Sequence, residues 1–195
     1  MTKYRIQLLA VLVVIIFLAS ACEDDGITTV VTTEDQLALD IVKINDYIAK
    51  KGYANVDTTS RGVRYVVTNE GNGDTIESGD IVSLHYTGRF TDDVLFDTSI
   101  DTVAINNDVY DSTRTYKPIF IFTQSESGWA LVSAYPNVRP GFSNGVTEAL
   151  KKIKVGGSAR LIIPSTLGYG ASSYQGIPPN TILIFDVYPV KVRKD

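Results

Sequence analysis

The sequence is poor in the residues that most often carry metal or covalent chemistry, since it contains one cysteine, Cys22, and one histidine, His85. A single cysteine excludes an intramolecular disulfide, and this pair cannot build a zinc site from several Cys or His ligands. Because Cys22 lies near the N-terminus, the rest of the chain has no thiol nucleophile. We therefore expect an activity that uses neither a metal ion nor a covalent nucleophile.

An excess of positive charge is also missing, because 18 Lys and Arg residues stand against 22 Asp and Glu residues, for a net charge of -4. Such a chain has no surplus of cations to neutralise a phosphate backbone, so nucleic acid is not an expected partner. Long hydrophobic runs are missing too, since the apolar stretch at residues 8–19 is shorter than the about 20 residues that a membrane-spanning helix needs. With 44% hydrophobic and 21% charged residues, the composition predicts one globular domain with an appendage.

The N-terminus has the pattern of a secretory signal. Lys3 and Arg5 charge its start, the apolar run follows, and small residues precede Cys22. This order of features predicts that residues 1–21 are a signal peptide, which is removed from the mature protein.

Lipidation is the favoured fate of Cys22. The run LASAC at residues 18–22 resembles a bacterial lipobox, and a secreted chain that keeps a free, exposed thiol is unusual. Ordinary signal cleavage at the same bond is the alternative, because the run ASA also fits the A-x-A pattern. The acidic residues 23–25 resemble the surface-export signal of Bacteroidetes lipoproteins, with a solvated tether as the alternative. We therefore expect a lipid-anchored protein of the cell envelope, at the outer membrane or surface of a Gram-negative bacterium.

A tether and a helix follow the cysteine. Residues 22–33 are mostly polar and rich in Thr, as expected of a tether, and residues 34–58 form an N-terminal helical segment. Thr33 occupies a capping position and Gly52 is a stop signal. The apolar residues that recur at helical spacing are Leu37, Ile41, Ile44 and Ile48. Their stripe is expected to pack on the main domain or on a second copy of the chain, rather than on a membrane, because acidic residues balance the Lys residues of the helix.

Residues 59–195 have the pattern of an α+β domain. Hydrophobic residues alternate at Val63, Tyr65 and Val67 before a turn cluster, which predicts a strand and then a loop. Further strands are predicted over residues 81–86, 119–122, 158–163 and 181–192, and one short helix over residues 143–153. The fold class is therefore α+β, with an antiparallel sheet wrapped on one short helix.

Four segments, taken in order, resemble the FKBP-type peptidyl-prolyl cis-trans isomerases. They are residues 82–88 (VSLHYTG), 96–99 (FDTS), 138–146 (VRPGFSNGV) and 163–187, which holds the runs IP, LGYG, IPPN and FDV. The similarity spans residues 61–192, and four segments in the order and approximate spacing of that family make it specific. The resemblance implies an FKBP-like fold, preceded here by the N-terminal amphipathic helix.

The resemblance also implies where the site lies, because in that family an apolar groove binds the proline side of an Xaa-Pro bond. It places in the catalytic part of the groove Tyr86, Phe96, Asp97, Phe142, Tyr169 and Phe185. It places against the bound polypeptide Val138, Arg139, Ile177, Ile119 and Phe120, with the backbone N–H of Arg139 as the group chiefly used. It implies no cofactor, and as partners it implies proline-containing polypeptides and macrolide-type ligands.

The alternation of side chains along the predicted strands agrees with this placement. Tyr86 shares a face with Leu84 and points to the core, whereas His85 points away and is not expected to act as a base. The strand at residues 119–122 stays ambiguous, since either Ile119 or Phe120 can face the groove. Asp97 also has two interpretations: it accepts a hydrogen bond from Tyr86 at the groove rim, or it serves nearby loop groups as a structural acceptor.

The chemistry of proline isomerisation suits such a groove. Amide resonance resists rotation about an Xaa-Pro bond with a barrier of about 18–20 kcal/mol. Twisting the bond breaks that resonance and makes the amide less polar, so an apolar, water-poor pocket favours the twisted state over the planar one. The expected activity is therefore peptidyl-prolyl cis-trans isomerisation that assists the folding of exported or cell-envelope proteins.

Departures from the family leave other functions open. Phe142 stands where the family usually has Trp, and an inserted segment within residues 99–137 makes this region longer than in compact members. The apolar residues around Trp129 are expected either to cover the groove as a lid or to pack on a sheet edge or the N-terminal helix. The alternatives are a non-catalytic FKBP-like binding or chaperone module, and an adhesin or assembly component that uses the N-terminal helix as its interface.

Overall fold

A computed structural model describes residues 31–123, 131–133 and 139–194, with residues 131–133 described by their backbone alone. The predicted signal peptide, Cys22, Trp129 and Val138 lie outside these residues, as does most of the predicted tether. The helical and strand segments below all belong to the unit from Thr32 onward. None of the described helices is long and apolar enough to cross a bilayer.

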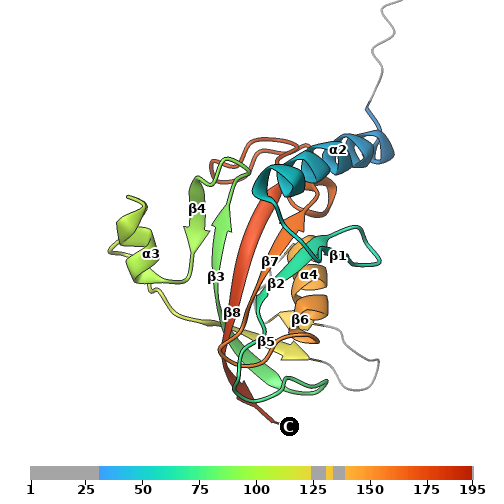
Figure 1. Cartoon of the computed structure of the whole chain (residues 1–195). Helices are drawn as coiled ribbons and strands as arrows, with labels where there is room; N and C mark the ends of the chain where they lie inside the picture. The colour runs from blue at the N-terminus through green and yellow to red at the C-terminus, as the bar shows by residue number, and fades with distance from the viewer. Residues whose placement is uncertain (1–30, 124–130, 134–138, 195) are drawn as a thin grey trace, which may run out of the picture. The chain divides into compact units, whose positions relative to one another are not determined.

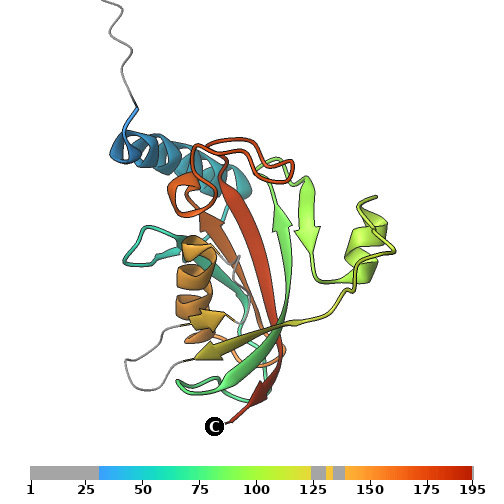
Figure 2. The ribbon, with the colours of Figure 1, turned by 180° about the vertical axis from the view of Figure 1, so that it is seen from behind.

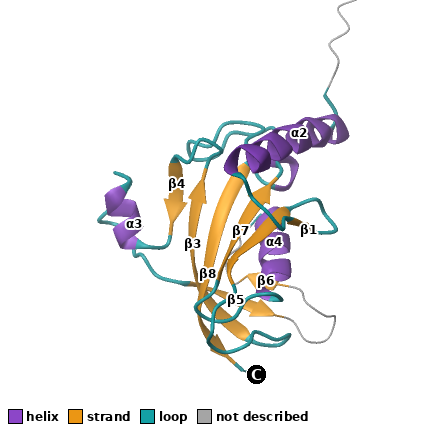
Figure 3. Cartoon of the chain, viewed as in Figure 1, coloured by secondary structure: helices purple, strands orange, loops and turns teal. Residues whose placement is uncertain are grey.

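The described strands form one eight-stranded antiparallel sheet (Figures 1 and 3). Its strands are β1 (Asp57–Thr58), β2 (Arg64–Asn69), β3 (Ile81–Arg89), β4 (Leu95–Thr98), β5 (Ile119–Thr123), β6 (Leu131–Ser133), β7 (Ser158–Ile163) and β8 (Leu183–Arg193). The order across the sheet is β1-β2-β7-β8-β3-β5-β6, and β4 pairs with β3. The long central strands β3 and β8 therefore run beside each other, although almost a hundred positions separate them in sequence.

Helix α4 (Pro140–Leu150) packs on one face of this sheet, as the view from behind in Figure 2 shows. Phe142, Val146 and Leu150 are all buried, and their four-residue spacing puts them on one side of the helix. The helix approaches the sheet closely at Gly145, where an added Cβ would lie 3.0 Å from side-chain atoms of Leu161. This contact holds the middle of α4 against β7, the strand of Leu161.

Helix α2 (Thr33–Lys51) packs against the opposite face of β7 and β8. Ile44 and Tyr47 of α2 form a core cluster with Ile162, Ile182 and Ile184, whereas the neighbouring residues of the two strands face α4. The alternation of strand side chains thus supplies both cores at once. Of the two partners expected for this helix, the main domain or a second copy of the chain, the structure shows contact with the main domain.

The ends of α2 are set by local capping chemistry. Thr32 is the N-cap, and its side chain and that of Asp35 form a reciprocal capping box, so the predicted cap at Thr33 was wrong by one residue. Gly52 closes the helix in the left-handed conformation, at φ 67°, as predicted.

A buried carboxylate ties α2 to the segment that follows β7. Asp40 is fully buried, and its Oδ2 accepts hydrogen bonds from the backbone N–H of Ser165 at 2.7 Å and from its hydroxyl at 2.6 Å. Ser165 begins the 3-10 helix η2 (Ser165–Leu167), which leads directly into Tyr169. The N-terminal helix is therefore bonded to the segment that forms part of the site.

The region after β4 contains more structure than the sequence predicted. Helix α3 (Asp101–Asn106) lies outside β4, beyond the β3 side of the sheet (Figures 1 and 2). Ala104 is its only buried residue. With six residues and one buried position, α3 has too short an apolar period to be recognised. One short helix was expected in the domain, and this was wrong. The described residues of the domain form two α-helices, α3 and α4.

Candidate functional site

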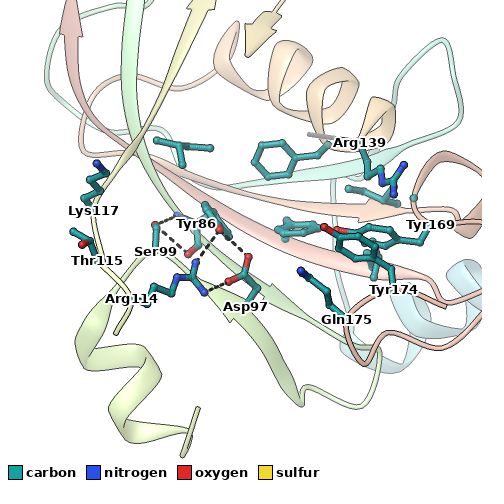
Figure 4. A pocket seen from close by; sticks show the side chains of 16 residues that line it. Tyr86, Asp97, Ser99, Arg114, Thr115, Lys117, Arg139, Tyr169, Tyr174 and Gln175 are labelled. Atoms are coloured by element: carbon teal, nitrogen blue, oxygen red, sulfur yellow. Dashed lines mark hydrogen bonds and ion pairs between the residues drawn. The ribbon is translucent and has the colours of Figure 1, made fainter. Parts of the chain in front are cut away.

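The site is a cavity of about 360 Å³ between the N-terminus of α4, the centre of the sheet and the loops at the ends of the strands (Figure 4). The residues that line it are Tyr86, Asp97, Ser99, Arg114, Thr115, Lys117, Ile119, Arg139, Phe142, Ile163, Gly168, Tyr169, Tyr174, Gln175, Leu183 and Phe185. Segments from most of the domain contribute, so the cavity exists only when the sheet and α4 are assembled.

Three aromatic rings from three elements form its apolar floor. Phe142 enters from α4, Phe185 from β8 and Tyr86 from β3. The ring centroids of Phe142 and Phe185 are 5.0 Å apart in an edge-to-face arrangement, and Tyr86 lies 6.1 Å from Phe142 and 6.0 Å from Phe185. These are favourable aromatic contacts, so the rings fix one another in place.

A polar cluster closes one side of the floor. The hydroxyl of Tyr86 donates to Asp97 Oδ2 at 2.7 Å, and Arg114 Nη1 lies 2.5 Å from Asp97 Oδ1. Arg114 also donates to the Tyr86 hydroxyl at 3.3 Å. Asp97 therefore makes both of the contacts considered for it, since its carboxylate accepts hydrogen bonds from the hydroxyl of Tyr86 and from Arg114 in the loop before β5.

The ionisation states in this cluster follow from its packing. Burial, together with the negative charge of Asp97, raises the pKa of Tyr86, so its hydroxyl stays protonated and available as a donor. Burial opposes the charge of Arg114, yet its hydrogen bond and ion pair with Asp97 raise the pKa of that guanidinium. The cluster therefore orients the phenol of Tyr86 and keeps its hydroxyl a hydrogen-bond donor.

A stack of aromatic and cationic groups forms the other side. The rings of Tyr169 and Tyr174 lie nearly parallel, with centroids 4.4 Å apart, and the guanidinium of Arg139 sits 4.5 Å from the Tyr169 ring centre. Burial raises the pKa of Tyr169, so this hydroxyl stays neutral as well. Arg139 is the N-cap residue of α4, and the helix therefore sets where its side chain begins.

His85 lies outside the cavity, as the strand alternation predicted. Its Nδ1 is 3.1 Å from the carbonyl oxygen of Ser99 and 3.0 Å from the Ser99 hydroxyl. The imidazole is thus held in a structural contact between β3 and the residue after β4.

Most of the predicted site residues come together. Those that line the cavity are Tyr86, Asp97, Phe142, Tyr169, Phe185, Arg139 and Ile119. Phe96 packs edge-on behind Phe185 at 5.6 Å, and Ile177 is buried in the same core, so both support the wall without lining it. Val138 lies outside the described residues.

Phe120 is the prediction that the structure contradicts. Its side chain is exposed on the opposite face of the sheet, near Phe122 and Lys191, whereas Ile119 lines the cavity. The pairing of Ile119 with Leu84 sets this parity, because successive residues of a strand point to opposite faces. One of the two candidates had to be wrong.

Sequence reasoning missed Arg114, Tyr174 and Gln175, which lie in connections between elements. Arg114 is one of two basic residues in the insertion, and nothing in the sequence sets it apart. Its partner Asp97 is 17 positions away, and no periodicity brings the two together.

Comparison with known proteins gives consistent results. A family model described as FKBP-type peptidyl-prolyl cis-trans isomerase matches residues 73–188. The chain is 34% identical over 140 residues to a probable FKBP-type peptidyl-prolyl cis-trans isomerase of Haemophilus influenzae, which covers 71% of this chain and 46% of that protein. It is 33% identical over 138 residues to the FKBP-type isomerase FkpA of Escherichia coli, with 71% and 40% covered.

A solved structure is similar as well. The crystal structure of FkpA from Escherichia coli superposes with a TM-score of 0.51 at 29% identity, covering 83% of this chain and 63% of that chain. The chain spans less than half the length of the two curated relatives that it matches.

Proposed function

This chain belongs to the FKBP-type peptidyl-prolyl cis-trans isomerase family, and on that premise we propose that its domain interconverts the cis and trans forms of Xaa-Pro bonds in polypeptides. The observation that carries the proposal is the floor of three aromatic rings, from Tyr86, Phe142 and Phe185, inside one cavity. A pyrrolidine ring is apolar and compact, and such a floor is a surface on which it can pack.

The floor favours the reaction because of what happens to the amide. A planar Xaa-Pro amide is stabilised by resonance and is strongly polar, whereas the twisted amide has lost both properties. Moving it from water to an apolar surface therefore costs the twisted state less than the planar state. If the cavity stabilises the twisted state over the planar state by about 1.4 kcal/mol, the rate rises about tenfold.

The polar cluster contributes by holding the floor rather than by transferring protons. Tyr86 is fixed at its hydroxyl by Asp97 and Arg114, and its ring is thereby kept against Phe142 and Phe185. Phe142 replaces the usual Trp of the family with a smaller ring, and its edge-to-face contact with Phe185 keeps the floor continuous. This continuity supports catalysis over a groove that only binds.

The direct test is turnover of short Xaa-Pro peptides, followed by magnetisation exchange between the cis and trans signals in NMR spectra. We expect the purified protein to accelerate exchange, and Phe142→Ala to lower kcat/KM about tenfold or more because it removes part of the floor. Val42→Ala, at an exposed position of α2, is the control and should leave kcat/KM unchanged. Binding of the peptides without acceleration would instead identify a non-catalytic binding module.

We further propose that macrolide-type ligands occupy the same cavity, because they would present an apolar ring to the same floor. Such a ligand should inhibit turnover competitively, and Phe142→Ala should weaken the inhibition. Inhibition that is insensitive to Phe142→Ala would place the ligand elsewhere.

The proposed location is the cell envelope, with exported proteins as clients. The signal-like residues 1–21, the lipobox-like run that ends at Cys22 and the acidic residues 23–25 of the Bacteroidetes type support it. Each acyl chain on Cys22 would contribute about 0.8 kcal/mol per buried methylene to membrane affinity, so two or more chains would anchor the protein firmly. Cys22→Ser should release the protein into the soluble fraction, and an unmodified Cys22 in the mass spectrum of the mature protein would contradict the proposal.

A further inference from the structure

The cavity carries a charge opposite in sign to that of the chain. Three cationic side chains line its described part, Arg114, Lys117 and Arg139, and one carboxylate, Asp97. The whole chain, in contrast, has a net charge of -4. The balance of charge at the cavity thus differs in sign from that of the chain as a whole.

Asp97 does not neutralise this excess. Its two carboxylate oxygens are engaged by Arg114 and Tyr86, at 2.5 Å and 2.7 Å, so Asp97 and Arg114 compensate each other. Among the ion pairs formed by the described residues, none involves Lys117 or Arg139. Two positive charges at the cavity therefore remain without a carboxylate partner in that part of the chain.

Arg139 is held in a position that suits an acidic ligand. Its guanidinium lies over the stacked rings of Tyr169 and Tyr174, at 4.5 Å and 5.5 Å from their centres. Contact with the two rings restrains the side chain, and the guanidinium also forms a hydrogen bond with Tyr169. A guanidinium has several N–H donors, so others are left to bind a carboxylate in a two-pronged manner. Burial raises the pKa of Tyr169, so the ring beside Arg139 carries no negative charge of its own.

The two uncompensated cations lie on opposite sides of the floor. In Figure 4, Lys117 is at one end of the cavity lining and Arg139 is at the other, with Tyr86 between them. Lys117 comes from the segment just before β5, and Arg139 from the start of α4. A polypeptide with its proline on the aromatic floor would extend past one cation on its N-terminal side and past the other on its C-terminal side.

We propose that the cavity selects proline-containing segments in which an acidic residue flanks the proline, with Lys117 and Arg139 as the residues that determine this specificity. The inference rests on the proposed isomerase function, since it names the class of client for the same cavity. The recognised feature is a side-chain carboxylate near the Xaa-Pro bond.

The expected effect is moderate because both cations are solvent-exposed. Exposed ion pairs contribute little, so each cation should change the preference by about two- to fivefold. Salt screens exposed charges over about 8 Å at 0.15 M ionic strength, so the preference should be largest in dilute buffer.

The experiment measures kcat/KM by NMR exchange for acetylated, amidated peptides that carry Glu, Gln or Lys beside the proline. One set varies the residue before proline and a second set varies the residue after it. We expect Glu to be preferred to Gln, and Gln to Lys, in at least one set, by about two- to fivefold at each step in low salt. The Glu-to-Gln ratio is taken within each protein, so a general loss of activity in a variant cancels.

Two variants assign the preference to its residues. Arg139→Gln and Lys117→Gln should each reduce the Glu-to-Gln ratio, and if each flank of the proline meets one cation, they should do so in different peptide sets. Lys43→Gln, an exposed position of α2 away from the cavity, makes the same charge change and should leave the ratio as in the parent protein.

The outcomes separate this inference from the function on which it rests. Rapid turnover with equal rates for Glu, Gln and Lys peptides would overturn the inference and leave the isomerase function intact. A ratio that Lys43→Gln reduces as much as Arg139→Gln does would show a general field effect and would also overturn it. Tighter binding of Glu peptides without any turnover, measured as chemical-shift titrations on the same samples, would contradict the isomerase function and keep the charge preference.

Discussion

Phe185 illustrates how one side chain serves both the fold and the site. Its ring contacts those of Tyr86, Phe96 and Phe142, with centroid separations between 5.0 and 6.0 Å. Its neighbour Gly88 on β3 must be glycine because an added Cβ would lie 2.9 Å from Phe185 and 2.7 Å from Phe96. The floor of the cavity is thus also a packed layer of the core, and its shape is set with the precision of a core.

Phe185→Ala should therefore damage stability and turnover together. Removing the ring leaves a void among three other rings, and we expect a loss of about 3–4 kcal/mol in the free energy of unfolding and at least a tenfold lower kcat/KM. Urea denaturation and the peptide exchange assay measure the two effects. Phe185→Leu fills most of the void and should recover stability more than activity. Equal recovery of both would mean that the floor needs bulk rather than an aromatic edge.

His85→Ala, in contrast, should leave turnover largely intact, because His85 lies on the other face of β3 from Tyr86. The imidazole contacts Ser99 and does not line the cavity, so its loss should cost about 1 kcal/mol of stability and leave most of the activity. If a folded His85→Ala protein had no turnover, the mechanism based on an apolar floor would be wrong. An imidazole would then have to take part in the reaction.

At the scale of elements, α2 is a support for the site rather than a simple spacer. Asp40 holds the N–H and hydroxyl of Ser165, and the carbonyl of Ser165 in turn accepts from the N–H groups of Gly168 and Gly170. Gly168 and Tyr169 line the cavity. The helix thereby positions one wall of the site through a short chain of hydrogen bonds.

Asp40→Ala should expose that dependence. The buried N–H and hydroxyl of Ser165 would lose their acceptor, and we expect a loss of about 2–3 kcal/mol in the free energy of unfolding. The kcat/KM of the folded protein should also fall, because the segment that holds Tyr169 is released. Asp46→Ala, at an exposed position of the same helix, makes the same change in helix propensity; it should raise the free energy of unfolding by about 0.7 kcal/mol at most and leave kcat/KM unchanged. An unchanged kcat/KM for Asp40→Ala would limit α2 to a stabilising role.

Elements with a full hydrophobic period were predictable from the sequence, and those without one were not. Strand β7 has the predicted bounds, at residues 158–163, because its apolar run ends at a proline. Helix α4 begins three residues before its predicted start, since Pro140 is tolerated in the first turn, where no partner for its missing N–H is needed. Short elements such as α3 offer no period to read.

The same contrast holds for the site. Tyr86 and Phe185 could be placed from strand alternation and a family motif, because both lie on long, regular strands. The parity of β5 depends on its pairing with β3, which a sequence of alternating Ile and Phe does not specify. Arg114 reaches Asp97 only through the path of the segment that follows α3, so its role follows from tertiary structure alone.

At the scale of the whole described unit, the sheet is stabilised from both faces. The α4 side holds the larger core with the aromatic floor, and the α2 side holds Ile44 and Tyr47 against three isoleucines of the sheet region. The family model begins only at residue 73, so it includes neither α2 nor the first strands. The part of the chain that gives the family its pattern is therefore smaller than the part that buries the core.

Because the core extends beyond the segment that the family model matches, the effect of truncating the chain can be predicted. A chain that begins at Val31 keeps every contact of α2 described above and should match the full-length protein in urea denaturation and in kcat/KM. A chain that begins at Tyr53 would expose Ile162, Ile182 and Ile184, which are at most 6% exposed in the structure. Burying one such side chain contributes about 1.5–3 kcal/mol, and several lost at once approach the about 5–15 kcal/mol that stabilises a typical domain. The shorter chain should therefore unfold or aggregate at temperatures where the longer one turns over peptide, and equal denaturation midpoints for the two would show that the α4 core is sufficient by itself.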